Sequence, residues 1–318
     1  MHLLIPYAAS HASGCQAALS NLKLPKLQKL LPMLVAQPLD TGDELSWSPP
    51  HERALAKARG LPQQDGLIPW AAVEAQKHAA LAGLETSSGA WAFVTLCHWQ
   101  ASTFEVSMRQ IPMQDLTREE SDTLLAAMAP FFEQDGIRLY PLEPGCWLAQ
   151  GKVFANLRTA SPDRVHGRNL EPWMPGTAEA GGLIRLVSEM QMLLYTHPVN
   201  DAREARGSLP ANALWFSGAG MMPKESAMQP SPQGLQVIDA LKEAALNEDW
   251  TAWAGAWQTL DATAMADLLA AQTGGEPLQL TLCGERHAQT WVAQPLGLMQ
   301  KIKAKFASQP LSSLLSSL

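Results

Sequence analysis

Short apolar runs that end at a proline or a glycine alternate with amphipathic segments at both ends of the chain. The run "HLLIP" at the start is typical of a buried strand, and "PLQLTLCG" near residue 280 has the same character. Between them, leucines recur at helical spacing in the segment 22–34, with lysines in the gaps. Strands of this kind separated by helices predict a doubly wound α/β sheet.

The hydrophobic period changes from helical to alternating after residue 85. The runs "AWAFVTLCHWQ" and "STFEVSMRQ" predict two strands, and "IRLYPLEPGCWLAQG" continues the β pattern. A helix is predicted between the second and third of these runs. It begins after Thr117, and Glu120 three residues later completes a capping box. We therefore expect an inserted α+β domain at 85–155, within a core formed by 1–84 and 156–318.

Helical spacing returns in the second half of the chain. We expect a helix at 176–195, a buried strand in "PANALWFSGAG", a linker at 221–234, and further helices around 235–247, 250–260, 263–272 and 296–307. Trp250, Trp253 and Trp257 lie on one face of one of these helices. That face either packs in the core or docks a protein partner.

Charge and cysteine content narrow the classes of function. The net charge of −7 argues against extensive nucleic-acid binding, which needs an excess of lysine and arginine. The four cysteines are far apart and form no CxxC pair, so they predict no zinc site. The first residues lack the pattern of a signal peptide, and no segment approaches the roughly 18 apolar residues of a membrane span. We expect a cytoplasmic protein without a membrane partner.

One stretch, "HPVNDAREARGSLPANALWFSGAG" at 197–220, is rich in polar residues and glycine. Its guanidinium, amide and imidazole groups can form a pocket for a phosphorylated small molecule, because forked guanidiniums match phosphate geometry. The residues concerned are His197, Asn200, Arg203, Arg206 and Asn212. Alternatively the stretch is a structural junction, in which asparagine side chains bond to the backbone and prolines fix its path.

The same stretch resembles the archaeal-type cofactor-independent phosphoglycerate mutases, whose pattern reads HPVNxxRxxxGxPPAN followed by RGAG. The matching positions are His197, Pro198, Val199, Asn200, Arg203, Gly207, Pro210, Ala211, Asn212, Gly218, Ala219 and Gly220. Bacterial regulatory proteins of the RpfE type resemble the whole chain still more closely, especially at "LTLCGER". The mutase resemblance implies an alkaline-phosphatase-like α/β fold with an inserted domain.

The resemblance also implies two metal ions that activate a nucleophilic serine, and here the sequence departs from the family. The family has an aspartate directly after the first strand, whereas here no carboxylate precedes Asp40. The serine falls beside Trp47, and Cys283 to Arg286 stand where the family has a metal-binding Asp-His pair. Hard divalent ions need several anionic and imidazole ligands. We therefore expect no metal site and no cofactor, and a pseudoenzyme with a regulatory or partner-binding role.

An enzyme that uses other ligands is the alternative. The weak catalytic candidates are Ser48 and His51 as nucleophile and base, and Glu285 and His287 for proton transfer. A rebuilt site for manganese or magnesium would draw its ligands from Asp40, Asp43, Glu44, His51, Glu285 and His287. It would make the chain a phosphoglycerate mutase or a phosphohydrolase.

Overall fold

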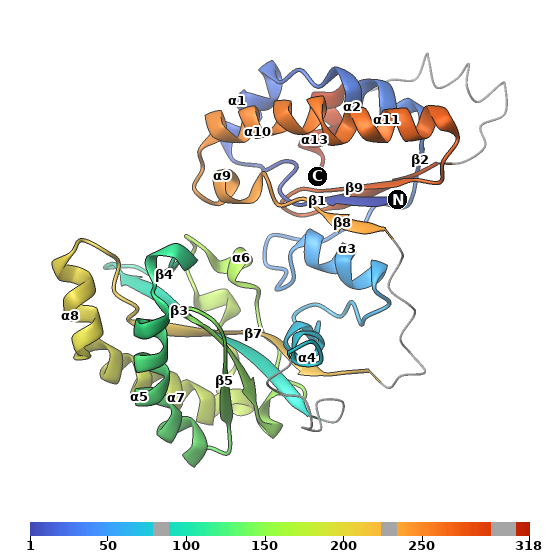
Figure 1. Cartoon of the computed structure of the whole chain (residues 1–318). Coiled ribbons are helices and arrows are strands. Elements are labelled where there is room, and N and C mark those ends of the chain that lie inside the picture. Colours follow the sequence, from blue (N-terminus) through green and yellow to red (C-terminus); the bar gives the residue numbers. More distant parts are fainter. Residues whose placement is uncertain (79–88, 224–233, 294–309) are drawn as a thin grey trace. The chain divides into compact units, whose positions relative to one another are not determined.

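The computed structural model describes residues 1–78, 89–223, 234–293 and 310–318, which form two compact units (Figure 1). The first unit comprises residues 1–60 and 229–318, and the second comprises 61–228. Both units combine helices with a sheet, so the predicted α/β class is confirmed.

A five-stranded sheet with the order β2-β10-β9-β1-β8 forms the centre of the first unit. Strand β1 (His2–Ile5) pairs in parallel with both β8 (Leu235–Val237) and β9 (Gln279–Cys283). Strand β10 (Ala288–Val292) returns antiparallel to β9, and the short β2 (Val35–Ala36) forms one edge. A central parallel strand has both faces covered, which explains why "HLLI" is wholly apolar apart from its first residue.

Helices cover both faces of this sheet, as expected for a doubly wound core. One face is covered by helices that include α1 (Ser13–Asn21), α2 (Pro25–Leu30), α10 (Trp250–Ala262) and α11 (Ala264–Gly274) (Figure 1). Helix α3 (Pro50–Ala58) packs on the other face, against Leu4 and Cys283. Short helices α9 (Lys242–Leu246) and α13 (Leu311–Ser316) complete the unit.

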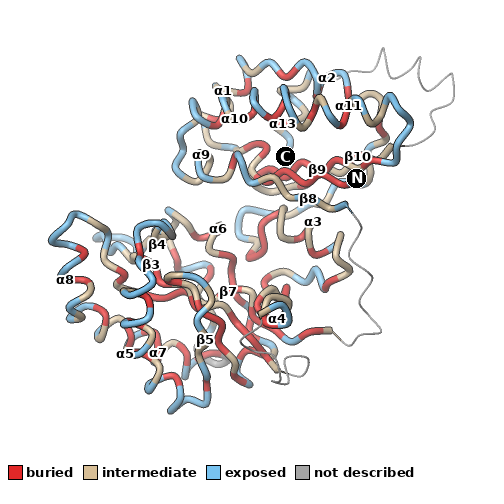
Figure 2. Tube along the Cα trace, viewed as in Figure 1, coloured by how far each residue is buried: buried red, intermediate tan, exposed pale blue. Residues whose placement is uncertain are grey.

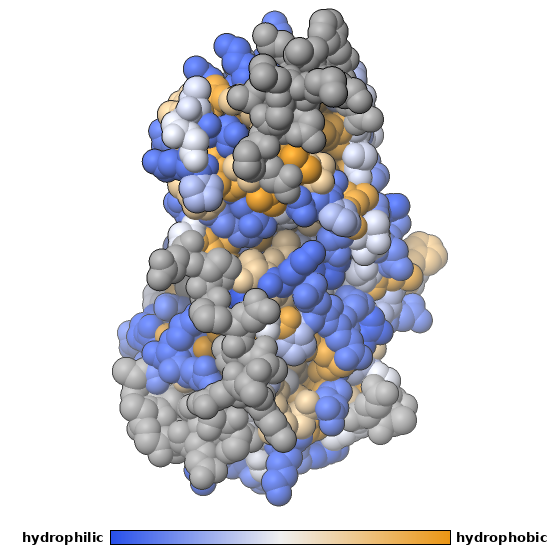
Figure 3. Space-filling model, turned by 90° about the vertical axis from the view of Figure 1, so that its right-hand side faces the viewer, coloured by the Kyte–Doolittle hydropathy of each residue, from blue (hydrophilic) through white to orange (hydrophobic). Residues whose placement is uncertain are grey.

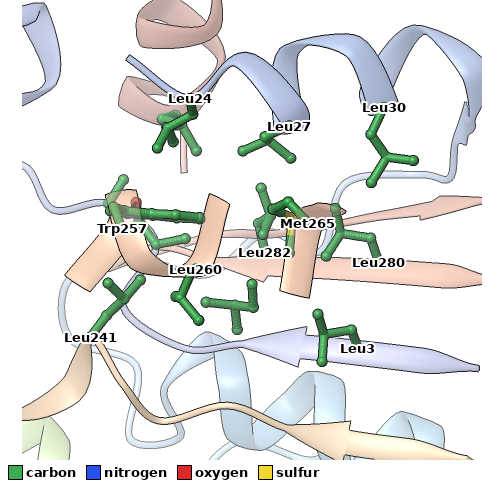
Figure 4. Packing of buried hydrophobic residues seen from close by; sticks show 14 of the residues in the cluster. Leu3, Leu24, Leu27, Leu30, Leu241, Trp257, Leu260, Met265, Leu280 and Leu282 are labelled. Atoms are coloured by element: carbon green, nitrogen blue, oxygen red, sulfur yellow. Dashed lines mark hydrogen bonds between the residues drawn. The ribbon is translucent and has the colours of Figure 1, made fainter. Parts of the chain in front are cut away.

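Leucines from α2 and the strands build the main core of the first unit. Leu24, Leu27 and Leu30 are buried and point towards Leu280, Leu282 and Trp257 (Figure 4). A buried carboxylate of α10 holds the start of α2 in place. Asp261 accepts hydrogen bonds from the backbone N–H groups of Lys26 and Leu27 at 3.1 and 2.8 Å. These N–H groups have no partner within the first turn of a helix, and an acidic acceptor also suits the positive end of the helix dipole.

The second unit is built on an antiparallel sheet. Strand β3 (Ala90–Ala101) pairs with β4 (Val106–Gln110), β6 (Cys146–Gln150) and β7 (Ala213–Met221), and β6 pairs with β5 (Arg138–Glu143). Helices α5 (Arg118–Gln134) and α7 (Thr177–Tyr195) contribute to the core of one face, and α4 (Trp70–Ala75) to that of the other. Short helices α6 (Pro162–Val165) and α8 (Pro198–Ala205) lie in the connections.

The expected insert at 85–155 lies inside this second unit, which extends further along the chain. The strand in "PANALWFSGAG" is present as β7, but it pairs with β3 instead of joining the sheet around β1. Helix α7 packs on the same sheet through Leu183, Leu186 and Met190. Hydrogen bonding between β3 and β7 therefore places β7 in the second unit.

Several predicted elements differ in type or extent. Residues 235–237 form strand β8, although a helix was predicted there, because the edge of β1 accepts them as a parallel partner. Helix α2 ends at Leu30 and continues as a 3-10 turn, because Pro32 cannot extend an α-helix. Helices α1 and α13 were not predicted. The helix predicted at 296–307 falls outside the described residues.

Burial follows this architecture in each unit. Buried residues line the strands and the inner faces of the helices (Figure 2). On the face shown in Figure 3, hydrophobic residues lie in small groups between hydrophilic ones. No helix in the described part of the chain is both long and apolar enough to cross a bilayer.

The buried histidine of β1 predicts a pH dependence for the first unit. Burial, helped by the nearby N-terminal charge, lowers the pKa of His2 to about 4, and its Nε2 lies 2.9 Å from Thr281 Oγ1. Below pH 6.5 the unfolded chain binds a proton that the folded chain does not, so stability falls as the pH drops from 6.5 to 4. The loss should reach about 3 kcal/mol. Urea unfolding of wild type and His2→Gln checks this, because the variant should lose that part of the slope; an unchanged slope would contradict it.

Candidate functional site

The carboxyl ends of β1 and β9 are where an α/β sheet places a site. The turn that follows β1 passes through Tyr7, whose φ of 57° is uncommon for a residue with a side chain. Three hydrogen bonds hold this turn closed: Ala8 N donates to Cys283 O at 2.7 Å, Trp253 Nε1 to Tyr7 O at 2.9 Å, and Trp257 Nε1 to Ala8 O at 3.2 Å. The backbone is thus fixed by the neighbouring strand and by two indoles from α10.

These contacts also decide between the two interpretations of the tryptophan face. Trp253 and Trp257 are fully buried and pack edge to face, with ring centroids 6.3 Å apart. Trp250 packs on Trp253 in the same way at 6.0 Å. The face therefore belongs to the core of the first unit. The docking surface for a protein partner was the wrong interpretation for this helix, because its rings are used to anchor the turn after β1.

An arginine and an aspartate form the centre of the polar contacts at this end of the sheet. Arg53, on α3, is 7 % exposed and donates from Nε to Asp40 Oδ2 at 3.2 Å. Its other nitrogens donate to the carbonyl oxygens of Ser48 at 2.7 Å and Arg286 at 3.1 Å. The chain around Gly42 encloses the guanidinium so closely that a Cβ there would lie 2.7 Å from Arg53 Nη2. A guanidinium thus occupies the place beside the Asp40 carboxylate.

The remaining acidic candidates are engaged in the same manner. Glu44 pairs with Arg286 at 2.9 Å. Glu285 accepts from Ser10 Oγ at 3.1 Å and from the His11 backbone N–H at 2.9 Å, and Asp43 accepts from the Leu45 N–H at 2.7 Å. In the described ranges no three His, Cys, Asp or Glu side chains come together in a group that could hold a metal ion. The ligand set of the enzyme alternative is therefore spread over separate protein contacts.

The catalytic candidates also contact neighbouring groups of the protein. Ser48 is buried, and its backbone carbonyl accepts a hydrogen bond from Arg53. The ring centroid of His51 lies 5.3 Å from that of Tyr7. His287 Nδ1 accepts from the Gly42 N–H at 3.3 Å. Burial, and then the charges of His11, Arg53 and Arg286, lower the pKa of His287. The His287 imidazole is therefore biased towards its neutral form, which suits an acceptor of a backbone hydrogen bond.

The turn between β9 and β10 is closed by the segment around Leu318. The carbonyl oxygen of Leu318 accepts from the backbone N–H groups of Arg286 at 3.1 Å and His287 at 2.7 Å. The Leu318 side chain is buried in the core of the first unit, and Ser316 Oγ donates to Gln16 Oε1 at 2.7 Å. A Cβ on Gly284 would lie 2.3 Å from the carbonyl carbon of Leu318, so this close approach requires glycine.

In the second unit, the asparagines of the stretch 197–220 bond to the backbone. Asn200 Nδ2 donates to the carbonyls of Leu194 at 2.8 Å and Ala211 at 3.0 Å, and Asn200 Oδ1 accepts from the Ala211 N–H. Asn212 exchanges two hydrogen bonds with the backbone of Trp99. These contacts agree with the structural junction that the sequence left open.

The first residue of this stretch has a structural contact as well. His197 precedes α8, and its Nδ1 accepts from the Val199 N–H at 3.2 Å. An acceptor at this position satisfies one of the N–H groups that a helix leaves unpaired in its first turn.

The two arginines of the stretch share one carboxylate. Arg203 is fully buried and bonds to the carbonyls of Leu209 and Asp115, and its Nη1 lies 3.3 Å from Glu120 Oε2. The side chain of Arg206 is 43 % exposed and pairs with Glu120 Oε1 at 2.7 Å. Glu120 also completes the predicted capping box of α5 with Thr117, which is confirmed.

The charges of this cluster shift the pKa values of Glu120 and Arg203. Burial raises the pKa of Glu120, but the hydrogen bonds from Arg206 and from the Thr117 N–H, together with both arginine charges, lower it overall. Burial lowers the pKa of Arg203, and the charge of Glu120 opposes that effect. A charge-neutralised arginine has little attraction left for an external anion, so Arg203 mainly ties α8 to the start of α5.

Some residues of the site could not be selected from the sequence. Nothing in "SPPHERALAKARG" distinguishes Arg53 from the neighbouring cations, because its partners lie 13, 5 and 233 positions away. The capping-box pattern marked Glu120 in the sequence, but no local pattern indicated that Glu120 pairs with Arg203 and Arg206. The indoles of α10 were visible as a pattern, but their acceptors in the turn after β1 were not.

Comparisons with known proteins point to one family. No protein-family model matches the chain. The chain is 31 % identical over 77 residues to a 2,3-bisphosphoglycerate-independent phosphoglycerate mutase of Methanosarcina barkeri, covering 24 % of this chain and 19 % of the relative. It is 26 % identical over 151 residues to a probable enzyme of the same name from Geobacter sulfurreducens, covering 46 % and 37 %. The matched segments thus span less than two fifths of the relatives' length.

Two solved structures align with nearly the whole chain at 13 % identity. One is a cofactor-independent phosphoglycerate mutase of Thermoplasma acidophilum, with a TM-score of 0.38 and coverage of 99 % of this chain and 98 % of that chain. The other is a protein of Pyrococcus horikoshii, with a TM-score of 0.45 and coverage of 99 % and 97 %. The sequence matches name the mutase family that the stretch 197–220 resembles. The resemblance to regulatory proteins of the RpfE type stays a prediction.

The approach of Leu318 to Gly284 yields one prediction. Gly284→Ala should destabilise the first unit by about 1–3 kcal/mol, because the new methyl group overlaps the Leu318 carbonyl and something must shift. Gly255→Ala is the matched control: nothing lies near that position of α10, so the same change should raise stability by up to about 1 kcal/mol. Urea unfolding measures both. Equal effects of the two substitutions would contradict the packing of Leu318 against the turn.

The cluster around Glu120 yields a second prediction about stability. Arg203→Ala should cost the second unit about 3 kcal/mol, because two buried carbonyls lose their donor and one partner of a buried ion pair is removed. Arg206→Ala removes a half-exposed partner of the same carboxylate and should cost less than about 1 kcal/mol. If Arg203→Ala unfolds at the same urea concentration as wild type, the structural role is wrong.

Proposed function

We propose that this chain is a divergent, non-catalytic relative of the cofactor-independent phosphoglycerate mutases, with a regulatory or partner-binding role. One observation carries the proposal: at the end of the sheet where such an enzyme needs metal ligands, the carboxylates are held by arginines and N–H groups of the protein itself. The central pair is Asp40 with the buried Arg53.

The electrostatics of this end of the sheet support the proposal. Two divalent cations a few ångströms apart need several anionic ligands that face a common space. Here Asp40, Glu44 and Glu285 each face a different internal donor. Opening the Asp40 pair would leave the buried Arg53 guanidinium without its carboxylate, which is unfavourable. The residues present therefore do not fit a two-metal centre.

The turn after β1 supports the same conclusion. The mutase resemblance implies an aspartate at this point, and the chain has Pro6, Tyr7 and Ala8 there. The carbonyl groups of Tyr7 and Ala8 in this turn accept hydrogen bonds from the indole N–H groups of Trp253 and Trp257, respectively. The backbone of this turn is thus held by hydrogen bonds from α10 and to β9.

The family resemblance concerns residues whose contacts are structural. His197, Asn200, Arg203 and Asn212 match the family pattern, and each bonds within the second unit. Such a junction serves the fold of a unit whether or not the other unit carries out catalysis. The similarity to named mutases is therefore compatible with a chain that has exchanged catalysis for binding.

Metal analysis combined with a phosphoglycerate mutase assay tests the proposal. The purified chain, incubated with manganese and desalted, should retain well under one metal ion per chain and show no manganese-dependent turnover. Asp40→Asn and the matched Asp201→Asn, an exposed aspartate of α8, should behave like wild type. Stoichiometric manganese with turnover that Asp40→Asn abolishes and Asp201→Asn preserves would establish the enzyme alternative.

A further inference from the structure

A hollow of about 390 Å³ lies at one edge of the sheet in the second unit. Four strands contribute residues there: β3 and β5 begin at this edge, and β6 and β7 end at it. The residues that line the hollow are Gly89, Ala90, Gly136, Arg138, Gln150, Gly151, Lys152, Ala155 and Met221. Its volume falls in the range of small-molecule pockets, roughly 300–1,000 Å³.

Strand register brings the polar side chains of this hollow together. Arg138 and Gln150 are direct partners in the β5–β6 ladder, so their side chains lie on the same face about 5 Å apart at Cβ. Lys152 follows two residues after Gln150, past an extended Gly151. The Gln150 side-chain oxygen accepts from Tyr140 Oη at 3.4 Å, which leaves its NH₂ group as a donor.

The lining is cationic without a compensating acid. It holds one guanidinium and one ammonium, and none of its nine described residues is an aspartate or a glutamate. This differs from the cluster around Arg203 and Arg206, where Glu120 pairs with both guanidiniums and Asp115 adds a second negative charge. The whole chain has a net charge of −7, so the attraction of this cationic lining for an anion is local to this edge.

Glycines make the hollow accessible to a ligand. A Cβ on Gly136 would meet no atom within 4 Å, which shows open space beside it. Gly136 has a φ of +71°, which glycine adopts without strain, and it allows the chain to turn from α5 into β5. The floor of the hollow is thus backbone, with Arg138 and Lys152 as the charged groups beside it.

We propose that this hollow binds a small phosphorylated molecule, with the phosphate held between Arg138 and Lys152 and a hydrogen bond from the Gln150 amide. A planar guanidinium and a mobile ammonium are the donors that phosphate groups take in proteins. The size of the hollow fits a phosphate ester of a few carbon atoms. The proposal stands independently of the absence of catalysis, because it concerns the second unit alone.

Binding of glycerol phosphate and of inorganic phosphate tests the site. Amide NMR of the full chain should show saturable shifts of the Gly89, Gly136 and Gly151 signals with either probe, and none with glycerol. A larger response to glycerol phosphate would indicate that the organic part adds contacts. Absence of saturable shifts with both probes up to about 10 mM would overturn the proposal.

Charge-removing variants locate the site. Arg138→Gln/Lys152→Gln should weaken binding by about tenfold or more, since both charge-assisted contacts are lost. Arg109→Gln/Arg118→Gln removes two exposed cations of the same unit outside the hollow and should change the affinity less than about twofold. Equal weakening in both double variants would mean general charge attraction and would overturn the assignment. Their thermal unfolding identifies any variant that is misfolded, in which case the single variants Arg138→Lys and Lys152→Gln give the comparison.

Discussion

The closed turn after β1 is the constraint on which the first unit depends. Strand β1 lies between β8 and β9, so both of its edges are hydrogen-bonded and its end is fixed in the middle of the sheet. From there the chain must turn back over the helical face, and it does so through Tyr7 in a left-handed conformation. The cost of that conformation is offset by three hydrogen bonds and by burial of the two indoles that donate two of them.

Arginines balance the charge of the carboxylates at the same end of the sheet. Arg53 touches Asp40 and the carbonyls of Ser48 and Arg286, and thereby joins the loop before α3 to the turn after β9. Arg286 in turn pairs with Glu44 from that loop. The carbonyl of Leu318 completes the arrangement by accepting from two N–H groups of the β9–β10 turn. The carboxylates of Asp40 and Glu44 thus have arginine partners within the protein, which makes this end of the sheet a structural junction.

The second unit separates two kinds of positive charge. Arg203 and Arg206 meet at Glu120, the carboxylate that also caps α5, and Asp115 adds a second negative charge, so their role is to connect α8 with α5. Arg138 and Lys152 lie at an open edge whose lining carries no carboxylate among its described residues. Two pairs of cations of similar composition thus differ in function because of their surroundings. Neutralisation and burial favour a structural role, whereas an open cationic hollow favours a ligand.

The sequence by itself determined the elements with a strong local signal. The apolar runs of β1 and β9, the alternation of β3, the capping box of α5 and the tryptophan face of α10 were all readable, because each depends on residues within a few positions of one another. The α/β class followed from their order. The departures of the chain from the metal-binding pattern of the mutases were also visible in the sequence alone.

Only the tertiary structure decided which elements pair and which charges meet. Residues 235–237 form a strand because β1 offers them an edge more than 230 positions away in the chain, and β7 belongs to the second unit because β3 is its partner. The choice between an anion pocket and a junction at 197–220 rested on Glu120 and on backbone groups distant in sequence. Local patterns specify a segment's conformation, but burial and electrostatic pairing depend on contacts that only the folded chain creates.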